Sequence, residues 1–129
     1  MIKDTFQSHL AKAKGLGSTG EGTDHFIAQR VTAIALIPLL LWFCLSLAFL
    51  PQMDYQSLIT WISSPIRAIL LIILSLITFY HLELGLQVII EDYISTYYLK
   101  LSSIVFMKML CGFLAMASVF SILKISLSS

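Results

Sequence analysis

The residues best suited to chemistry lie in one stretch, HLELGLQVIIEDY, residues 81–93. A helix turns by about 100° per residue, which places His81, Gly85 and Asp92 on one stripe. At about 1.5 Å per residue, His81 lies about 16 Å from Asp92 along the axis, inside an otherwise apolar run. Neutral imidazole is an axial ligand for haem iron, and Gly85 would leave room for a large flat ligand. Alternatively, His81 only hydrogen-bonds to a neighbouring helix, and residue type alone leaves both interpretations open.

Asp92 and Tyr93 end the same apolar run. A phenol beside a carboxylate, on a stripe that leads towards His81, suits redox chemistry that consumes protons. A tyrosine at such a position is also typical of the aromatic belt at a membrane interface, which is how we interpret Tyr97 and Tyr98. Both interpretations of Tyr93 stay open at this point.

Two charged side chains also have more than one interpretation. Arg30 precedes the first apolar segment, and it is either a topology anchor or a cation that reaches a buried anion such as a haem propionate. Glu83 points about 200° away from His81 on a helix. We therefore expect a protonated Glu83 that pairs with Gln87 or with a hydroxyl of the first helix, and a proton relay is the alternative role.

The composition determines the elements that hold these residues. Of 129 residues, 58% are hydrophobic and only 12% are charged, and the mean hydropathy is +0.91, far from ordinary soluble composition. Three apolar segments each have the ~20 residues needed to cross about 30 Å of hydrocarbon. Such segments must be helical, because no water is available to satisfy an exposed backbone. We therefore predict an all-α membrane protein whose three transmembrane helices comprise residues 31–50, about 66–90 and about 104–123.

The chain is predicted to have two parts, a polar N-terminal arm of residues 1–30 and a three-helix transmembrane domain of residues 31–129. Lys and Arg indicate the orientation, because cytoplasmic segments carry an excess of them. Six are expected before the first helix or around the second connection, against two on the other side. We predict that the N-terminus is inside and the C-terminus outside. The six are Lys3, Lys12, Lys14, Arg30, Lys100 and Lys108, and the two are Arg67 and Lys124.

Other features of the sequence add little chemistry. Residues 51–65 are expected to form a short, nearly uncharged loop, with Pro65 in the first turn of the second helix. A net charge of +1 gives no indication of nucleic-acid binding. Cys44 and Cys111 both fall within predicted helices, so we interpret them as small apolar side chains and not as a disulfide framework or a zinc site.

A family resemblance rests on two motifs. Residues 81–93 form the pattern H-x3-G-x-Q-V-x3-D-Y, and HFIAQRVTAIAL stands at the start of the first helix. With this combination the chain resembles the smaller hydrophobic membrane anchor subunits of succinate dehydrogenase (respiratory complex II). The resemblance covers most of the length, although the third helix contributes little beyond its hydrophobicity.

The resemblance implies a role in electron transfer. In that family a flavoprotein oxidises succinate to fumarate, and electrons pass through an iron-sulfur subunit to ubiquinone, where that subunit meets two membrane anchors. Haem b lies between the anchors. By resemblance, His81 is one axial ligand of the haem iron, and the larger, cytochrome b-type anchor subunit supplies the other. Tyr93 would hydrogen-bond a quinone carbonyl oxygen, Asp92 would assist proton delivery, and Arg30 would lie near the haem propionates or the quinone pocket.

The resemblance also implies a location in the bacterial or mitochondrial inner membrane and a subunit that is not catalytic alone. It assigns no role to His25. The alternative from another class is a small proton-coupled transporter or a structural membrane partner that uses His81 and Glu83 as proton-titrating groups. Three helices of this size leave little room for a substrate pathway, which favours the electron-transfer anchor.

Overall fold

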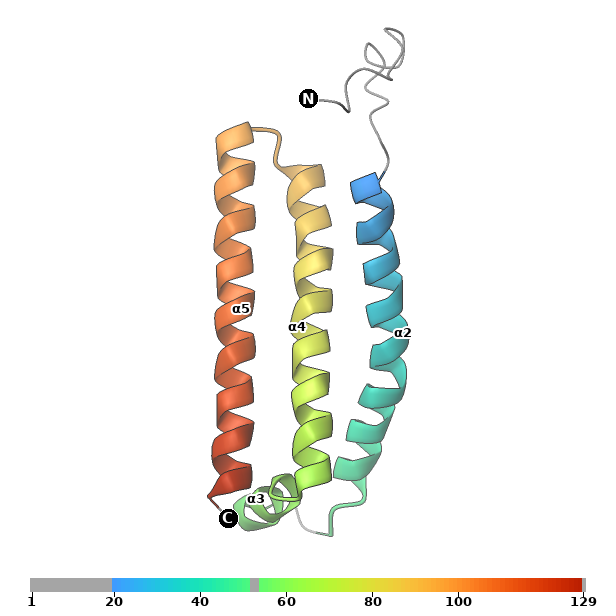
Figure 1. Cartoon of the computed structure of the whole chain (residues 1–129), viewed down its shortest axis with the longest axis vertical. Helices are drawn as coiled ribbons and strands as arrows, with labels where there is room; N and C mark the ends of the chain where they lie inside the picture. Colours follow the sequence, from blue (N-terminus) through green and yellow to red (C-terminus); the bar gives the residue numbers. More distant parts are fainter. Residues whose placement is uncertain (1–19, 52–53, 129) are drawn as a thin grey trace, which may run out of the picture.

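The structure is a computed structural model that describes residues 20–51 and 54–128. These residues form four helices and no strand. Figure 1 shows three long helices side by side, with α4 in the middle, and the short α3 lying across the end of the bundle where α4 begins. The helices are α2 (Gly20–Ala48), α3 (Tyr55–Ile62), α4 (Pro65–Tyr93) and α5 (Tyr97–Leu127).

The predicted three apolar helices are confirmed. In the described residues, three helical segments are long and apolar enough to cross a membrane: Gly22–Ala48, Pro65–Tyr93 and Tyr97–Leu127. Helices α4 and α5 extend beyond the predicted segments at both ends, whereas α2 begins before residue 31 and ends at Ala48, short of the predicted residue 50. Helix α2 begins at Gly20, so the last part of the predicted arm is helical, whereas residues 1–19 lie outside the described part of the chain.

The ends of α4 determine where the candidate site residues lie. Pro65 occupies the first turn, as predicted, because its fixed φ suits a helix start and its missing N–H is not needed there. At the other end, the Ile94 N–H donates to the Ile90 carbonyl at 3.1 Å and closes the last turn. Asp92 and Tyr93 are therefore the last two residues of α4.

Helix α2 continues through Pro38 to Ala48. A proline inside a helix removes one backbone hydrogen bond and favours bending, and α2 is visibly curved in Figure 1. The contacts with α4 that matter for the candidate site, described below, come from the part of α2 that precedes Pro38.

The first connection differs from the predicted loop, because it contains α3. Asp54 caps this helix by accepting a hydrogen bond from the Ser57 backbone N–H at 3.3 Å. The hydrogen bonding from Ser57 holds the pKa of the Asp54 carboxyl below its ordinary value. Near the other end of the helix, Trp61 is buried and stacks on Trp42 of α2, with ring centroids 5.9 Å apart. An N-cap and one aromatic anchor thus stabilise a helix too short to stand out in the sequence.

The interior of the bundle is small and centred on α4. Seven side chains in the described residues are buried, and none of them is polar or charged. Most large apolar side chains are exposed, which is the surface expected of a chain surrounded by lipid or by other membrane helices. Ser75 Oγ donates to Ser118 Oγ at 2.9 Å and joins α4 to α5. The buried side chains are Trp61, Ala68, Leu71, Leu74, Leu84, Met107 and Cys111.

Candidate functional site

His81 lies on the face of α4 that is turned towards α2. Its Nδ1 is 2.9 Å from the hydroxyl oxygen of Thr32, which is 49 residues away in the sequence. The same hydroxyl oxygen is 2.8 Å from the Ala28 carbonyl oxygen and 3.1 Å from that of Gln29. The hydrogen bond to a neighbouring helix that we considered for His81 is therefore present. It uses only one of the two ring nitrogens.

A cavity of about 200 Å³ adjoins His81. Phe26, Gln29, Arg30 and Ala33 of α2 form the other walls. The guanidinium carbon of Arg30 lies 4.8 Å from the centroid of the Phe26 ring, and the arginine is otherwise exposed. The structure thus brings two of the predicted site residues, His81 and Arg30, to the same cavity.

Gly85 lies one turn beyond His81 and also faces α2. A Cβ atom added to Gly85 would lie 3.8 Å from the side-chain nitrogen of Gln29, which is an ordinary van der Waals distance. The space beside this glycine is therefore bordered by a side chain of the same protein. A single Cβ would therefore fit at Gly85 against the end of the Gln29 side chain.

Asp92 and Tyr93 lie apart from this cavity. Twelve residues at about 1.5 Å each separate Tyr93 from His81 by about 18 Å along α4. Both residues are exposed, and Tyr93 retains 85% of its accessible surface. As the last two residues of α4, they belong to the end of that helix that lies beside the start of α2 (Figure 1). The structure therefore contains two separate candidate places, the cavity at His81 and Arg30 and the open end of α4.

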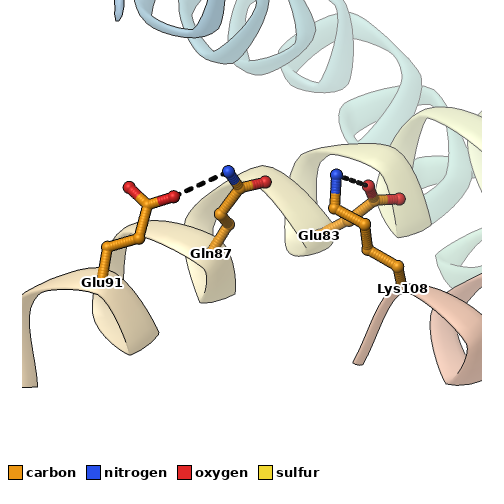
Figure 2. A network of polar contacts seen from close by, with 4 residues as sticks. All are labelled: Glu83, Gln87, Glu91 and Lys108. Atoms are coloured by element: carbon orange, nitrogen blue, oxygen red, sulfur yellow. Dashed lines mark hydrogen bonds and ion pairs between the residues drawn. The ribbon is translucent and has the colours of Figure 1, made fainter. Parts of the chain in front are cut away.

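A second polar group joins α4 to α5 (Figure 2). Lys108 Nζ lies 3.4 Å from Glu83 Oε1, and the Gln87 side-chain amide donates to Glu91 Oε1 at 2.8 Å. The prediction that Glu83 pairs with Gln87 or with a hydroxyl of the first helix is wrong, because a lysine of α5 faces this carboxylate. The charge count placed Lys108 beside the second connection, whereas in the structure it lies well inside α5.

Sequence reasoning missed a row of polar residues on α2. His25, Gln29 and Thr32 are spaced by four and three residues, which places them on one face of the helix. The Nε2 of His25 is buried without a hydrogen-bond partner among the residues that the structure describes. Gln29 borders Gly85 and Thr32 binds His81, so this row marks the face of α2 that meets α4. The spacing was the available signal.

Comparison with known proteins shows the family. The sequence model described as "Succinate dehydrogenase/Fumarate reductase transmembrane subunit" matches residues 4–115. The chain belongs to this family. Among its relatives, the succinate dehydrogenase hydrophobic membrane anchor subunit of Rickettsia bellii is 36% identical over 104 residues, 81% of this chain and 83% of the relative.

Two further relatives carry the same description as the Rickettsia bellii protein. The Rickettsia conorii protein is 33% identical over 112 residues, which are 86% of this chain and 88% of the relative. The Paracoccus denitrificans protein is 31% identical over 81 residues, 63% of each chain. No solved structure matches the chain.

Family membership confirms the predicted class. The chain is a multi-pass protein of the inner membrane, and it is a subunit of the succinate dehydrogenase complex that is not an enzyme by itself. Family membership does not by itself identify the residues that would bind a cofactor or a quinone, and these must be argued from the side chains of this chain.

The residues around the cavity fit one side of a haem group. An imidazole nitrogen ligates haem iron, and a guanidinium pairs with a carboxylate such as a propionate. The contact with Thr32 uses His81 Nδ1, which leaves Nε2 as the ring nitrogen that could ligate a metal. A cavity of about 200 Å³ accommodates only part of a porphyrin. This family member can therefore supply one wall, one ligand and one cation.

Proposed function

We propose that this chain is the smaller hydrophobic anchor subunit of a succinate:ubiquinone oxidoreductase. In this role it binds one side of haem b and forms part of the site at which ubiquinone is reduced. The observation that carries the proposal is the setting of His81. Thr32 holds its Nδ1 at 2.9 Å, and its ring adjoins the same cavity as Arg30.

His81 would ligate the haem iron, and the larger, cytochrome b-type anchor subunit would supply a second ligand. Haem b, when bound, provides one-electron redox chemistry. Arg30 would pair with a propionate, because a guanidinium offers two parallel N–H donors to a carboxylate. Its position in the wall of the His81 cavity, over the Phe26 ring, supports this role more than that of a simple topology anchor.

Tyr93 and Asp92 would act on ubiquinone at the end of α4. The Tyr93 phenol would donate a hydrogen bond to a quinone carbonyl oxygen and stabilise the negative charge that develops there during reduction. Asp92 would assist the delivery of protons. The exposure of both residues supports this role, because a quinone and the iron-sulfur subunit could reach them from outside the three-helix bundle.

The proposed orientation places the N-terminus and the α4–α5 connection on the cytoplasmic side and the C-terminus on the other. Without Lys108, which lies inside α5, five positive residues remain on the cytoplasmic side against two on the other. In this orientation Asp92 and Tyr93 lie on the side of the proposed flavoprotein and iron-sulfur subunits. The exposed apolar faces of the three long helices are left for the larger anchor subunit and for lipid.

A proton-coupled transporter is less well supported. It would need His81 and Glu83 to share a path for protons. Instead, His81 is bound by Thr32 of α2, whereas Glu83 is paired with Lys108 of α5. The two titratable groups therefore face different helices, and the contacts do not connect them.

The variant Tyr93→Phe tests the quinone part of the proposal. It keeps the aromatic ring and its packing at the interface but removes the donor. We expect succinate-dependent quinone reduction to fall by about tenfold or more, which corresponds to a loss of at least about 1.4 kcal/mol of transition-state stabilisation. Electron transfer from succinate to a soluble artificial acceptor that bypasses the membrane site should persist.

A matched control is Tyr98→Phe, which changes a tyrosine in the first turn of α5 that is 82% exposed. Tyr98→Phe should reduce quinone at the rate of the unmodified complex. A loss of both acceptor activities in Tyr93→Phe would indicate defective assembly and not a quinone donor. Normal quinone turnover in an intact Tyr93→Phe complex would return Tyr93 to the aromatic belt and refute its assignment.

A further inference from the structure

We infer that Thr32 is a positioning residue that selects the tautomer of His81, so that the Nε2 lone pair faces the ligand cavity. The inference rests on the proposed function, because it concerns the histidine that we assign to haem iron. It adds a residue of α2 to a site whose ligand is on α4.

The hydrogen-bonding capacity of the Thr32 hydroxyl determines the direction of its bonds. A hydroxyl has one proton to donate and two lone pairs that accept. Thr32 Oγ1 lies 2.8 Å from the Ala28 carbonyl oxygen, and a carbonyl oxygen can only accept. A threonine that donates to the carbonyl four residues earlier is a common arrangement in helices. The hydroxyl proton is therefore directed to Ala28, and the hydroxyl oxygen is left to accept from His81.

The tautomer of His81 follows from this assignment. A neutral imidazole carries one proton, on either Nδ1 or Nε2. Nδ1 lies 2.9 Å from an oxygen whose own proton is directed elsewhere, so Nδ1 carries the ring proton and donates it. Nε2 then has a free lone pair, which is the form that a metal requires. Histidine ligands of metals generally donate their other N–H to a nearby acceptor, which orients the ring and raises its basicity.

The Thr32 hydroxyl is a well-defined acceptor. Threonine is restricted in χ1, and the hydrogen bond to Ala28 restricts it further. The N–H···O–H···O=C chain from His81 to Ala28 also polarises each of its bonds. Nearby, the side chain of Gln29 on α2 lies beside Gly85 of α4, where an added Cβ would be 3.8 Å from its nitrogen. The packing of α2 thereby fixes the orientation of a ring that belongs to α4.

The test uses two substitutions in the assembled complex. Thr32→Val keeps the branched shape but removes the hydroxyl, and Thr32→Ser keeps the hydroxyl. We expect Thr32→Val to retain haem about 10- to 100-fold less tightly, the range typical for loss of a residue that holds a metal ligand. It should also shift the haem midpoint potential and the electron paramagnetic resonance spectrum, because the ring loses its fixed orientation. Thr32→Ser should resemble the unmodified complex in all three measurements.

The matched control is Thr78→Val. The Thr78 hydroxyl also donates to the carbonyl four residues earlier, that of Leu74 at 2.7 Å, but no histidine in residues 20–51 or 54–128 hydrogen-bonds to it. This control removes the same kind of helix-bound hydroxyl from α4. Its haem retention, midpoint potential and resonance spectrum should be those of the unmodified complex.

The outcomes separate this inference from the proposed function. If His81→Leu loses its haem bands but Thr32→Val equals Thr78→Val in all three measurements, the role of Thr32 is refuted and the ligand assignment stands. If His81→Leu keeps an unchanged haem spectrum, both are refuted. If Thr32→Val does not assemble, Thr32→Ala replaces it under the same criteria, because it also lacks the hydroxyl and adds no apolar volume.

Discussion

Reversal of the charges in the Glu83–Lys108 pair would show how strongly α5 is held to α4. The Nζ–Oε1 distance is 3.4 Å, and the side chains are 24% and 47% exposed. At an effective dielectric constant of about 20, this distance corresponds to an attraction of about 5 kcal/mol before costs. Desolvation and lost side-chain freedom offset most of it, and hydrogen bonds between membrane helices contribute about 0.6 kcal/mol on average. We expect a coupling free energy of about 1 kcal/mol.

The assay measures the midpoint temperature at which the detergent-solubilised complex dissociates. Size-exclusion chromatography of heated samples reports the fraction that remains assembled. Glu83→Lys places two ammonium groups together, and Lys108→Glu places two carboxylates together, so each should lower the midpoint. The double variant restores opposite charges and should recover at least half of the summed loss, because the pair interacts directly.

The control combines Glu83→Lys with Lys100→Glu. Lys100 Nζ donates to the Glu91 backbone carbonyl at 3.0 Å, so reversing its charge cannot restore the pair with Glu83. This combination should show no recovery. If Glu83→Lys with Lys108→Glu were as unstable as the sum of its single variants, the ion pair would contribute no coupling and our reasoning about α5 would be refuted.

Two other predictions concern α4. Gly85→Ala should assemble with its haem retained, because the new Cβ would lie 3.8 Å from Gln29, and it should gain up to about 1 kcal/mol of helix propensity. Gly85→Leu is too large for this space, so it should displace α2 and lower the haem content measured by pyridine haemochrome. Equal haem content in both variants would contradict this account of the space beside Gly85. Asp92→Asn should lower quinone turnover and change its dependence on pH, because it removes an ionisable group, and an unchanged pH profile in steady-state assays would exclude a role in proton delivery.

The sequence predicts the three long helices well, because apolar length is a property of each segment by itself. It also predicts the separation of His81 from the Asp92–Tyr93 pair, since helix rise converts residue number into distance. Helix α3 was missed because eight residues between two longer apolar segments resemble a connection. Its N-cap at Asp54 and its packing through Trp61 become visible only when the neighbouring helices are present.

The partners of the polar side chains could not be predicted from single helices. The apolar side chains of α2 do not gather on one face, so only its row of polar residues could have indicated the face that meets α4, and Thr32 was not recognised as the partner of His81. Glu83 was assigned to a neighbour on its own helix, because the register between α4 and α5 is a property of their packing. That register brings Lys108 to Glu83 and leaves Gln87 to pair with Glu91.

The reduced-minus-oxidised visible spectrum of the purified complex tests the central proposal most directly, with His81→Leu compared against His25→Leu. Both variants remove an imidazole from the region between α2 and α4, but only His81 adjoins the cavity with Arg30. We predict that His81→Leu loses or shifts the b-type haem bands, and that His25→Leu retains them. An unchanged spectrum in an assembled His81→Leu complex would contradict the assignment of His81 as a haem ligand.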